Sequence, residues 1–290
     1  MMTDDVLVFG ASGLLGAVLC PQLQRKGWRV FRQSREKNAE VQCDPADLGS
    51  VRAAVKGLRP VAIVNLVAIS NVDYCENHLS EAYIANVRTV EILATVAREM
   101  ESRPHLIQIS TDHLYSGTGP HRESTVLPIN VYAITKLAGE LVALQAGATV
   151  MRTSFFGRSH TERRISFTDW LYKSLVSREA FTVFEDVLFS ALHMETLAAC
   201  VARVIETRRV GVFNVGSRNG LSKARFAKLF AEELSLDTSG MKVGSFKDVK
   251  LTAPRPQDMR MDVTAFESTF GINMPDLAKQ IRVAADEYRS

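Results

Sequence analysis

The sequence predicts an α/β fold in which a doubly wound parallel sheet is followed by a smaller C-terminal α/β lobe. A continuous apolar run at residues 6–9 and a β-rich stretch at residues 61–66 are typical of buried strands. Amphipathic stretches of helical length separate such runs, and strands that alternate with helices form parallel sheets. Beyond Phe155 the predicted elements become shorter and more mixed. We therefore expect a first domain over residues 1–154, with contributions from later segments, and mainly a substrate-binding lobe over residues 155–290.

The first half of the chain alternates between strands and helices. The strands are expected at residues 6–9, 28–31, 40–43, 61–66, 106–109 and 149–153. The helices are expected from the glycines at residues 10–16 up to Gly27, and at residues 47–57, 79–100 and 131–144. The intervening loop at residues 115–130 contains glycines, prolines and charges, and is expected to cover a bound substrate.

The second half contains fewer clear signals. A polar and basic segment at residues 157–164 predicts a mobile loop. Ser222 is a good N-cap for one of the helices that follow. The elements expected here are helices at residues 167–176, 194–208, 222–234 and 275–288, an extended stretch at 181–184 and a strand at 211–215.

Composition excludes several classes of protein. The net charge is only +3 without a long basic run, which gives no reason to expect nucleic-acid binding. No apolar segment is long enough to span a bilayer, and no basic segment precedes the first apolar run as in a secretory signal. The four cysteines are scattered, which predicts reduced thiols rather than disulfides or a metal site. We therefore expect a cytoplasmic protein without a bound metal.

Three glycines stand where the first predicted strand gives way to a helix. Gly10, Gly13 and Gly16 permit a tight turn, a close approach of the backbone to a pyrophosphate, and close packing of helix on strand. The N-terminus of the helix would direct N–H groups and a positive dipole end at the phosphates. Strand, glycine turn and helix in this order predict a Rossmann-like dinucleotide site. An ordinary glycine-rich turn is the alternative.

The end of the second strand bears on the choice of cofactor. Arg32, Ser34 and Arg35 stand where an acidic residue would otherwise hold the adenosine ribose hydroxyls. Arginine and serine suit a 2′-phosphate instead, which favours NADPH, with NADH as the alternative. A solvated basic loop would also explain these residues. After the third strand, the carboxylate of Asp44 is placed to meet the adenine.

A tyrosine and a lysine four residues apart suggest proton chemistry. Tyr132 and Lys136 share one face of the predicted helix, and a nearby ammonium favours the phenolate form of a tyrosine. Thr111 adds a hydroxyl at the end of the preceding strand, where it can hold a carbonyl or alcohol oxygen. A surface pair on an amphipathic helix is the alternative. In the helix predicted over residues 79–100, Asn86 is either a buried strut or an exposed-edge residue.

With these residues in view, the chain resembles the extended short-chain dehydrogenase/reductases over nearly its full length. Within that superfamily it is most similar to the dTDP-4-dehydrorhamnose reductase family. The most specific feature is the segment from Tyr132 to Lys136 together with its spacing from Thr111. Further matching segments are Asn65-Leu66-Val67-Ala68, Gly117-Thr118-Gly119, Gly139-Glu140, Gly211-Val212-Phe213-Asn214 and Arg255-Pro256.

The resemblance implies a homodimeric enzyme that uses NADPH or NADH to reduce a 4-keto group on a nucleotide-linked deoxysugar. It implies that Tyr132 donates the proton, that Lys136 holds the nicotinamide ribose and lowers the Tyr132 pKa, and that Thr111 binds the sugar oxygen. Phe155 would lie against the sugar, although a position of Phe155 and Phe156 in the core is an equally good alternative. The other implied cofactor contacts are Gly10, Ser12, Gly13, Leu14, Leu15 and Gly16 at the pyrophosphate, with Val67 and Ala68 beside the cofactor.

One departure from the family pattern concerns the substrate side. The family commonly has an aromatic residue where this chain has His113, and related dehydratases have a glutamate there, so dehydration is not expected. His113 is either a titratable group facing the sugar or a hydrogen-bonded structural residue. Two other functions remain open. They are a non-catalytic NADP-binding regulatory subunit, similar to the partner of a methionine adenosyltransferase, and a nucleotide-sugar epimerase.

Overall fold

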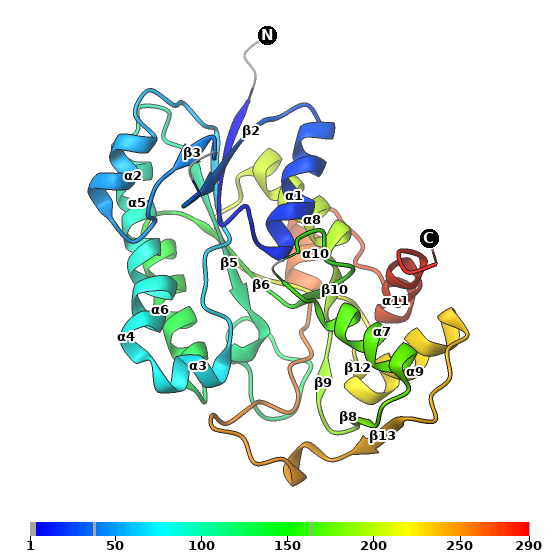
Figure 1. The fold of residues 1–290 in the computed structure, drawn as a ribbon. Coiled ribbons are helices and arrows are strands. Elements are labelled where there is room, and N and C mark those ends of the chain that lie inside the picture. Colours follow the sequence, from blue (N-terminus) through cyan, green and yellow to red (C-terminus); the bar gives the residue numbers. More distant parts are fainter. Residues whose placement is uncertain (1–3, 37–38, 163, 290) are drawn as a thin grey trace.

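A seven-stranded parallel sheet forms the centre of the molecule (Figure 1), in a computed structural model that describes residues 4–36, 39–162 and 164–289. Its order is β3-β2-β1-β4-β5-β6-β11, so the order reverses between β1 and β4, as in doubly wound dinucleotide-binding folds. The predicted fold class is therefore confirmed. The strands are β1 (Asp5–Phe9), β2 (Arg29–Ser34), β3 (Val41–Gln42), β4 (Ala62–Asn65), β5 (His105–Thr111), β6 (Thr149–Thr153) and β11 (Gly211–Val215).

Helices cover both faces of this sheet (Figure 1). Successive residues of β1 alternate between two cores, because neighbouring side chains of a strand point to opposite faces. Val6 and Val8 join the core beneath α1, α8 and α10, whereas Leu7 and Phe9 join the core beneath α2, α5 and α6. These helices are α1 (Leu14–Arg25), α8 (Met194–Thr207), α10 (Thr264–Phe270), α2 (Leu48–Ala54), α5 (Thr89–Glu99) and α6 (Val131–Gln145).

The chain returns to the first domain after residue 154. Strand β11 pairs with β6, and α8 and α10 pack on the sheet. The outer strand and two covering helices of the sheet therefore come from the second half of the chain.

The helix expected over residues 79–100 is divided in the structure. It consists of α4 (Leu79–Tyr83), a π-helical turn η1 (Ile84–Arg88) and α5, and a short helix that sequence reasoning missed, α3 (Val72–Asn77), precedes it. Asn86 in the π turn is buried and acts as a strut: its Oδ1 accepts from the Ile69 backbone N at 3.0 Å and its Nδ2 donates to Thr135 Oγ1 at 3.1 Å. A Cβ on Gly139 would lie 2.3 Å from the Asn86 carbonyl oxygen, so this turn packs directly on α6.

The C-terminal lobe has a separate aromatic-rich core. Its helices are α7 (Phe167–Ser177), α9 (Lys223–Leu234) and α11 (Leu277–Asp286). Small strand pairs complete it, namely β7 (Phe155–Phe156) with β10 (Leu192–His193), β8 (Phe181–Phe184) with β13 (Met241–Gly244), and β9 (Leu188–Phe189) with β12 (Leu221–Ser222). Two 3₁₀ turns, η2 (Asp112–Leu114) and η3 (Phe246–Asp248), follow β5 and β13.

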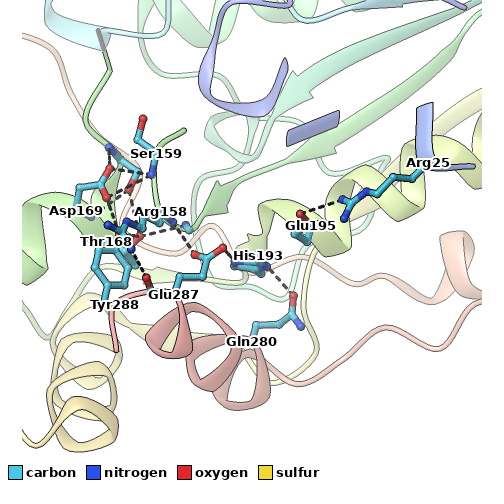
Figure 2. Close-up of polar contacts among 12 residues, drawn as sticks. Arg25, Arg158, Ser159, Thr168, Asp169, His193, Glu195, Gln280, Glu287 and Tyr288 are labelled. Carbon is cyan, nitrogen blue, oxygen red and sulfur yellow. Dashed lines mark hydrogen bonds and ion pairs between the residues drawn. The ribbon is translucent and has the colours of Figure 1, made fainter. Parts of the chain in front are cut away.

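The last residues of the chain hold the start of the segment that was predicted to be a mobile loop (Figure 2). Glu287 Oε2 accepts from the Arg158 backbone N at 2.8 Å, and Glu287 Oε1 lies 3.1 Å from Nε2 of the buried His193. The Tyr288 hydroxyl donates to Asp169 Oδ1 at 2.6 Å. These contacts join the end of α11 to α7 and β10, and they hold Arg158 by long-range interactions that sequence composition does not reveal.

Three features of the described residues bear on function. Cys20, Cys43, Cys75 and Cys200 are all buried free thiols. Across the described ranges, no group of three or more His, Cys, Asp or Glu side chains is placed to hold a metal ion. The helices in those ranges are also too short or too polar to cross a membrane.

Candidate active site

The glycine turn lies at the carboxyl end of β1, where the strand order reverses. Gly10 has a φ of +77°, a left-handed conformation that favours glycine. A Cβ on Gly16 would lie 2.4 Å from the Ala11 carbonyl oxygen, so glycine is required for α1 to pack this closely on the turn. Gly13 is the N-cap of α1, and no side chain caps the first-turn N–H groups. The turn therefore fits the pyrophosphate of a dinucleotide.

The end of β4 lies directly against this turn. A Cβ on Gly10 would lie 3.0 Å from the Val67 backbone N. Asn65 Oδ1 accepts a hydrogen bond from the same nitrogen at 3.1 Å, which sets the path of the chain into Val67 and Ala68. These two residues thus lie at the edge of the sheet where open α/β folds bind their ligands.

A buried glutamine that sequence reasoning missed supports the turn from β2. Gln33 Oε1 accepts from the Gly10 backbone N at 3.1 Å, and its Nε2 donates to the Cys43 carbonyl at 2.8 Å. The sequence feature that could have identified Gln33 is a polar side chain at a buried position of a strand. Its two hydrogen bonds join the first three strands beneath the dinucleotide turn.

The residues expected to meet the adenosine end lie at the edge of β2 and β3. Arg32 Nη2 is paired with Glu40 Oε1 at 2.7 Å, so its charge is shared with a carboxylate. Ser34 ends β2, and Arg35 is exposed just beyond it. Asp44 Oδ1 accepts a backbone N–H two residues later, which orders the turn after β3. The prediction of a 2′-phosphate contact therefore rests on Ser34 and Arg35 more than on Arg32.

Thr111 on β5 comes together with Tyr132 and Lys136, which both lie on α6. Thr111 is the last residue of β5, and its side chain hydrogen-bonds with that of Tyr132. Lys136 Nζ donates to the Ile109 carbonyl on the same strand at 2.7 Å. Asn130 starts α6 by accepting from the Ala133 backbone N at 2.8 Å, which sets where the helix begins. All three side chains are buried, so they form a site rather than a surface pair.

The electrostatics of this trio differ from the expectation that Lys136 lowers the tyrosine pKa. Burial raises the pKa of Tyr132 above its ordinary value, and the hydrogen bond with Thr111 only partly offsets this. Burial also lowers the pKa of Lys136 to about 8, with Glu140 acting in the opposite direction. Tyr132 thus keeps its proton at neutral pH, which is the state that a proton donor needs.

A buried polar network fixes the helix α6, which carries Tyr132 and Lys136. The Arg152 guanidinium bonds both carboxylate oxygens of Glu140, with Nη2 2.7 Å from Oε2, and Nη1 donates to the Tyr115 hydroxyl at 3.0 Å. The Tyr115 hydroxyl donates to Asn214 Oδ1 at 2.5 Å, and Asn214 Nδ2 donates to the Asp262 carbonyl at 3.1 Å. This network joins α6 to β6, β11 and the segment before α10.

A cavity of about 280 Å³ lies beyond the end of β5, between the sheet domain and the lobe. Asp112 and His113, which directly follow Thr111, line one side. Phe155 is not part of the lining; it pairs with Leu192 and packs against the core of the sheet domain. The other lining residues are Ser154, Phe167, Trp170, Thr182, Val183, Phe184, Val187, Phe189, Lys223, Phe246, Arg255, Pro256 and Met259.

His113 lies between the cavity and the tyrosine. Its ring meets the Tyr132 ring edge-on, with centroids 5.5 Å apart. Burial lowers the pKa of His113 to about 4, and the positive charges of Arg255 and Lys223 act in the same direction. The imidazole is therefore neutral at pH 7. Its Nδ1 is buried and has no hydrogen-bond partner within the described residues.

Most of the cavity was missed by sequence reasoning. The Arg255-Pro256 segment was recognised only as a weak family signal, yet Arg255 Nη2 lies 2.9 Å from Asp73 Oδ2 and so joins this segment to α3. Lys223 and Trp170 were not singled out at all. They come from separate lobe helices, and no local spacing marks residues that only the packing of the lobe brings together.

Comparison with known proteins shows the family to which the chain belongs. The family model described as RmlD substrate binding domain matches residues 3–290. The chain belongs to this family. The match supports the resemblance to dTDP-4-dehydrorhamnose reductases that the motifs indicated, and it places the chain among NAD(P)-dependent oxidoreductases that act on a keto group.

The chain is also similar to individual proteins with different names. The dTDP-4-dehydrorhamnose reductase of Escherichia coli is 27% identical over 94% of this chain and 94% of its own length. The methionine adenosyltransferase 2 subunit beta of Bos taurus is 28% identical over 92% of this chain and 82% of its own length. The solved structure of dTDP-4-dehydrorhamnose reductase from Bacillus anthracis in complex with NADP has a TM-score of 0.89 at 22% identity, covering 99% of this chain and 100% of that one, and it shows the shared fold.

Proposed function

We propose that the protein is an NADPH-preferring reductase of a nucleotide-linked 4-keto-deoxysugar. One observation carries the proposal: Thr111, Tyr132 and Lys136 are buried together, and the two residues that follow Thr111, Asp112 and His113, line a cavity. The nicotinamide cofactor, when bound, supplies the hydride. The sugar nucleotide is the substrate named for several family members, and a homodimer remains a prediction from the resemblance.

In this proposal each member of the trio has a separate task. Thr111 holds the carbonyl oxygen of the substrate near the Tyr132 hydroxyl. Tyr132 donates its proton to that oxygen as the alcohol forms, and its raised pKa keeps the proton in place until then. Lys136 is anchored on the Ile109 carbonyl and presents its charge to the ribose of the cofactor. Burial of all three side chains strengthens these interactions by excluding water.

The regulatory alternative is favoured by one specific observation, the similarity to methionine adenosyltransferase 2 subunit beta. The two proposals differ in what they require of the cavity. A reductase needs space for a substrate near Tyr132, and the cavity that fits this need is lined by His113, whose ring meets that of Tyr132 edge-on. An epimerase on the same scaffold would return its hydride, so it would not consume NADPH.

Turnover of NADPH with sugar nucleotides tests the proposal. The purified protein is expected to oxidise NADPH, followed by the loss of absorbance near 340 nm, when it is given a dTDP-linked 4-keto-6-deoxysugar, and to oxidise NADH more slowly. Product analysis should show one alcohol per NADPH consumed. Lack of turnover with any such substrate, together with stoichiometric capture of a methionine adenosyltransferase, would reverse the assignment in favour of the regulatory role.

The rate of reduction is expected to fall as the pH rises through about 8. The pKa of Lys136 is lowered to about 8, so its ammonium predominates below that pH and is lost above it. Tyr132 stays protonated over the same range because its pKa is raised. A profile of kcat/KM from pH 6 to 10 should be level at first and then decline roughly tenfold per pH unit. A level profile up to pH 10 would show that the charge of Lys136 is not required.

A further inference from the structure

Lys223 is a cation held at the wall of the cavity by aromatic rings. It is the first residue of α9, and its Nζ lies 3.6 Å from the centroid of the Phe189 ring and 4.3 Å from that of Phe167. Both rings also line the cavity. An ammonium above two ring faces is attracted to their negative potential, which holds its position. The proposed proton chemistry at Tyr132 gives Lys223 no task.

The charge of Lys223 is not neutralised at close range. In the part of the chain that the structure describes, no carboxylate lies at ion-pair distance from its ammonium, and Asp112 acts on it through a longer-range attraction. Arg255, the other cation of the lining, is paired with Asp73. Lys223 is therefore the cation of the lining that has no carboxylate within ion-pair distance among the described residues, and Asp112 is the carboxylate of the lining.

Two further features favour an anion beside Lys223. Ser222 caps α9 by accepting from the Arg225 backbone N at 3.1 Å, so the positive end of a 12-residue helix lies at this point. Burial also lowers the pKa of Lys223, because a cation removed from water is disfavoured without a close partner. An anionic ligand would supply that partner and offset the free-energy cost of removing the Lys223 ammonium from water.

We propose that Lys223 is a specificity-determining residue that binds an anionic oxygen group of the substrate. The inference rests on the proposed function for the class of substrate, in which such a group is either the diphosphate that joins sugar to nucleoside or a carboxylate on the sugar itself. Lys223 selects charged substrates over neutral ones and places the sugar between itself and Thr111. The cavity side chains of Phe167 and Phe189 keep the ammonium directed at the ligand.

Binding without turnover tests this role. Lys223→Met keeps most of the aliphatic stem but removes the charge, and the exposed Lys228 on the same helix provides the matched control Lys228→Met. Calorimetric titration of NADP⁺-saturated protein with dTDP, UDP-glucose and UDP-glucuronate measures the effect. We expect Lys223→Met to weaken dTDP binding about 10- to 100-fold, as for loss of a charged hydrogen bond, and Lys223→Arg to restore most of it. Lys228→Met should bind as the unaltered protein does.

The possible outcomes separate the two sources of the anion. If the anion is a sugar carboxylate, dTDP binding will be unchanged in Lys223→Met, but the preference for UDP-glucuronate over UDP-glucose will disappear. If Lys223→Met binds all three probes as the unaltered protein does, the proposal is wrong. Because no probe is turned over, these results do not depend on reductase activity. A protein that reduces no keto-sugar but loses dTDP affinity in Lys223→Met would refute the proposed function and leave the role of Lys223 intact.

Discussion

Replacing Tyr132 by phenylalanine is expected to lower kcat for keto-sugar reduction by about 10²- to 10⁴-fold, the range for loss of a general acid. The substitution removes one oxygen and keeps the ring that meets His113 edge-on. It also removes the hydrogen bond with Thr111, so a small rise in KM is expected as well. Steady-state rates of NADPH oxidation, with NADP⁺ affinity from fluorescence titration, provide the measurement.

The control for this substitution is Tyr74→Phe on α3. Tyr74 is 37% exposed and its hydroxyl donates to Glu81, so the loss of a hydroxyl there is expected to leave turnover within about twofold. In Tyr132→Phe the affinity for NADP⁺ should stay within a few-fold, since the glycine turn is unchanged. Retention of more than a tenth of the original kcat would show that another group delivers the proton.

Replacing Arg152 by methionine is expected to reduce the free energy of unfolding by about 3–5 kcal/mol. The side chains of Arg152 and Glu140 are only 4% and 1% exposed, so the substitution leaves a buried carboxylate without its partner. It also removes a donor from the Tyr115 hydroxyl. Glu140 lies on α6, the helix that also carries Lys136. Weakening this helix should therefore cause activity to be lost at a lower temperature than in the unaltered protein. Denaturant unfolding at pH 7 measures the change.

Two further variants show whether the buried, unpaired charge of Glu140 causes the loss of stability in Arg152→Met. The double substitution Arg152→Met and Glu140→Leu removes both charges and should cost less than the sum of the two single changes. Arg52→Met breaks the exposed pair between Arg52 and Glu99, and its cost should stay below about 1 kcal/mol. A loss in Arg152→Met no larger than in Arg52→Met would contradict the role assigned to the buried network.

The parts of the site that the sequence predicted are those whose geometry is set by residues close together in the chain. Gly10, Gly13 and Gly16 form a turn whose geometry depends on a few neighbouring residues, so their spacing was sufficient. Tyr132 and Lys136 share a helix face for the same reason. The pairing of these residues with Thr111 was also anticipated, because parallel strands deliver their carboxyl ends to one edge of the sheet.

The expectations that the structure corrects involve long-range packing. Phe155 was expected at the sugar, but its strand pairs with β10 and turns it to the core. The Tyr132 pKa was expected to fall beside Lys136, but the depth of burial, which a helical spacing does not reveal, raises it. The helix over residues 79–100 was expected to be regular, but close contact between Asn86 and Gly139 on α6 accompanies a π turn.

By itself, the sequence determined the class of fold, the glycine turn after the first strand and the residues that we propose for proton transfer, since periodicity and short spacings encode each of them. Only the tertiary structure decided what surrounds the trio. Lys223, Arg255 and Trp170 meet in one cavity because the lobe folds back over the end of β5, and the Arg152–Glu140 pair is buried because β6 lies beneath α6. Burial and charge balance depend on contacts between segments far apart in the chain, and these set the electrostatics of the site.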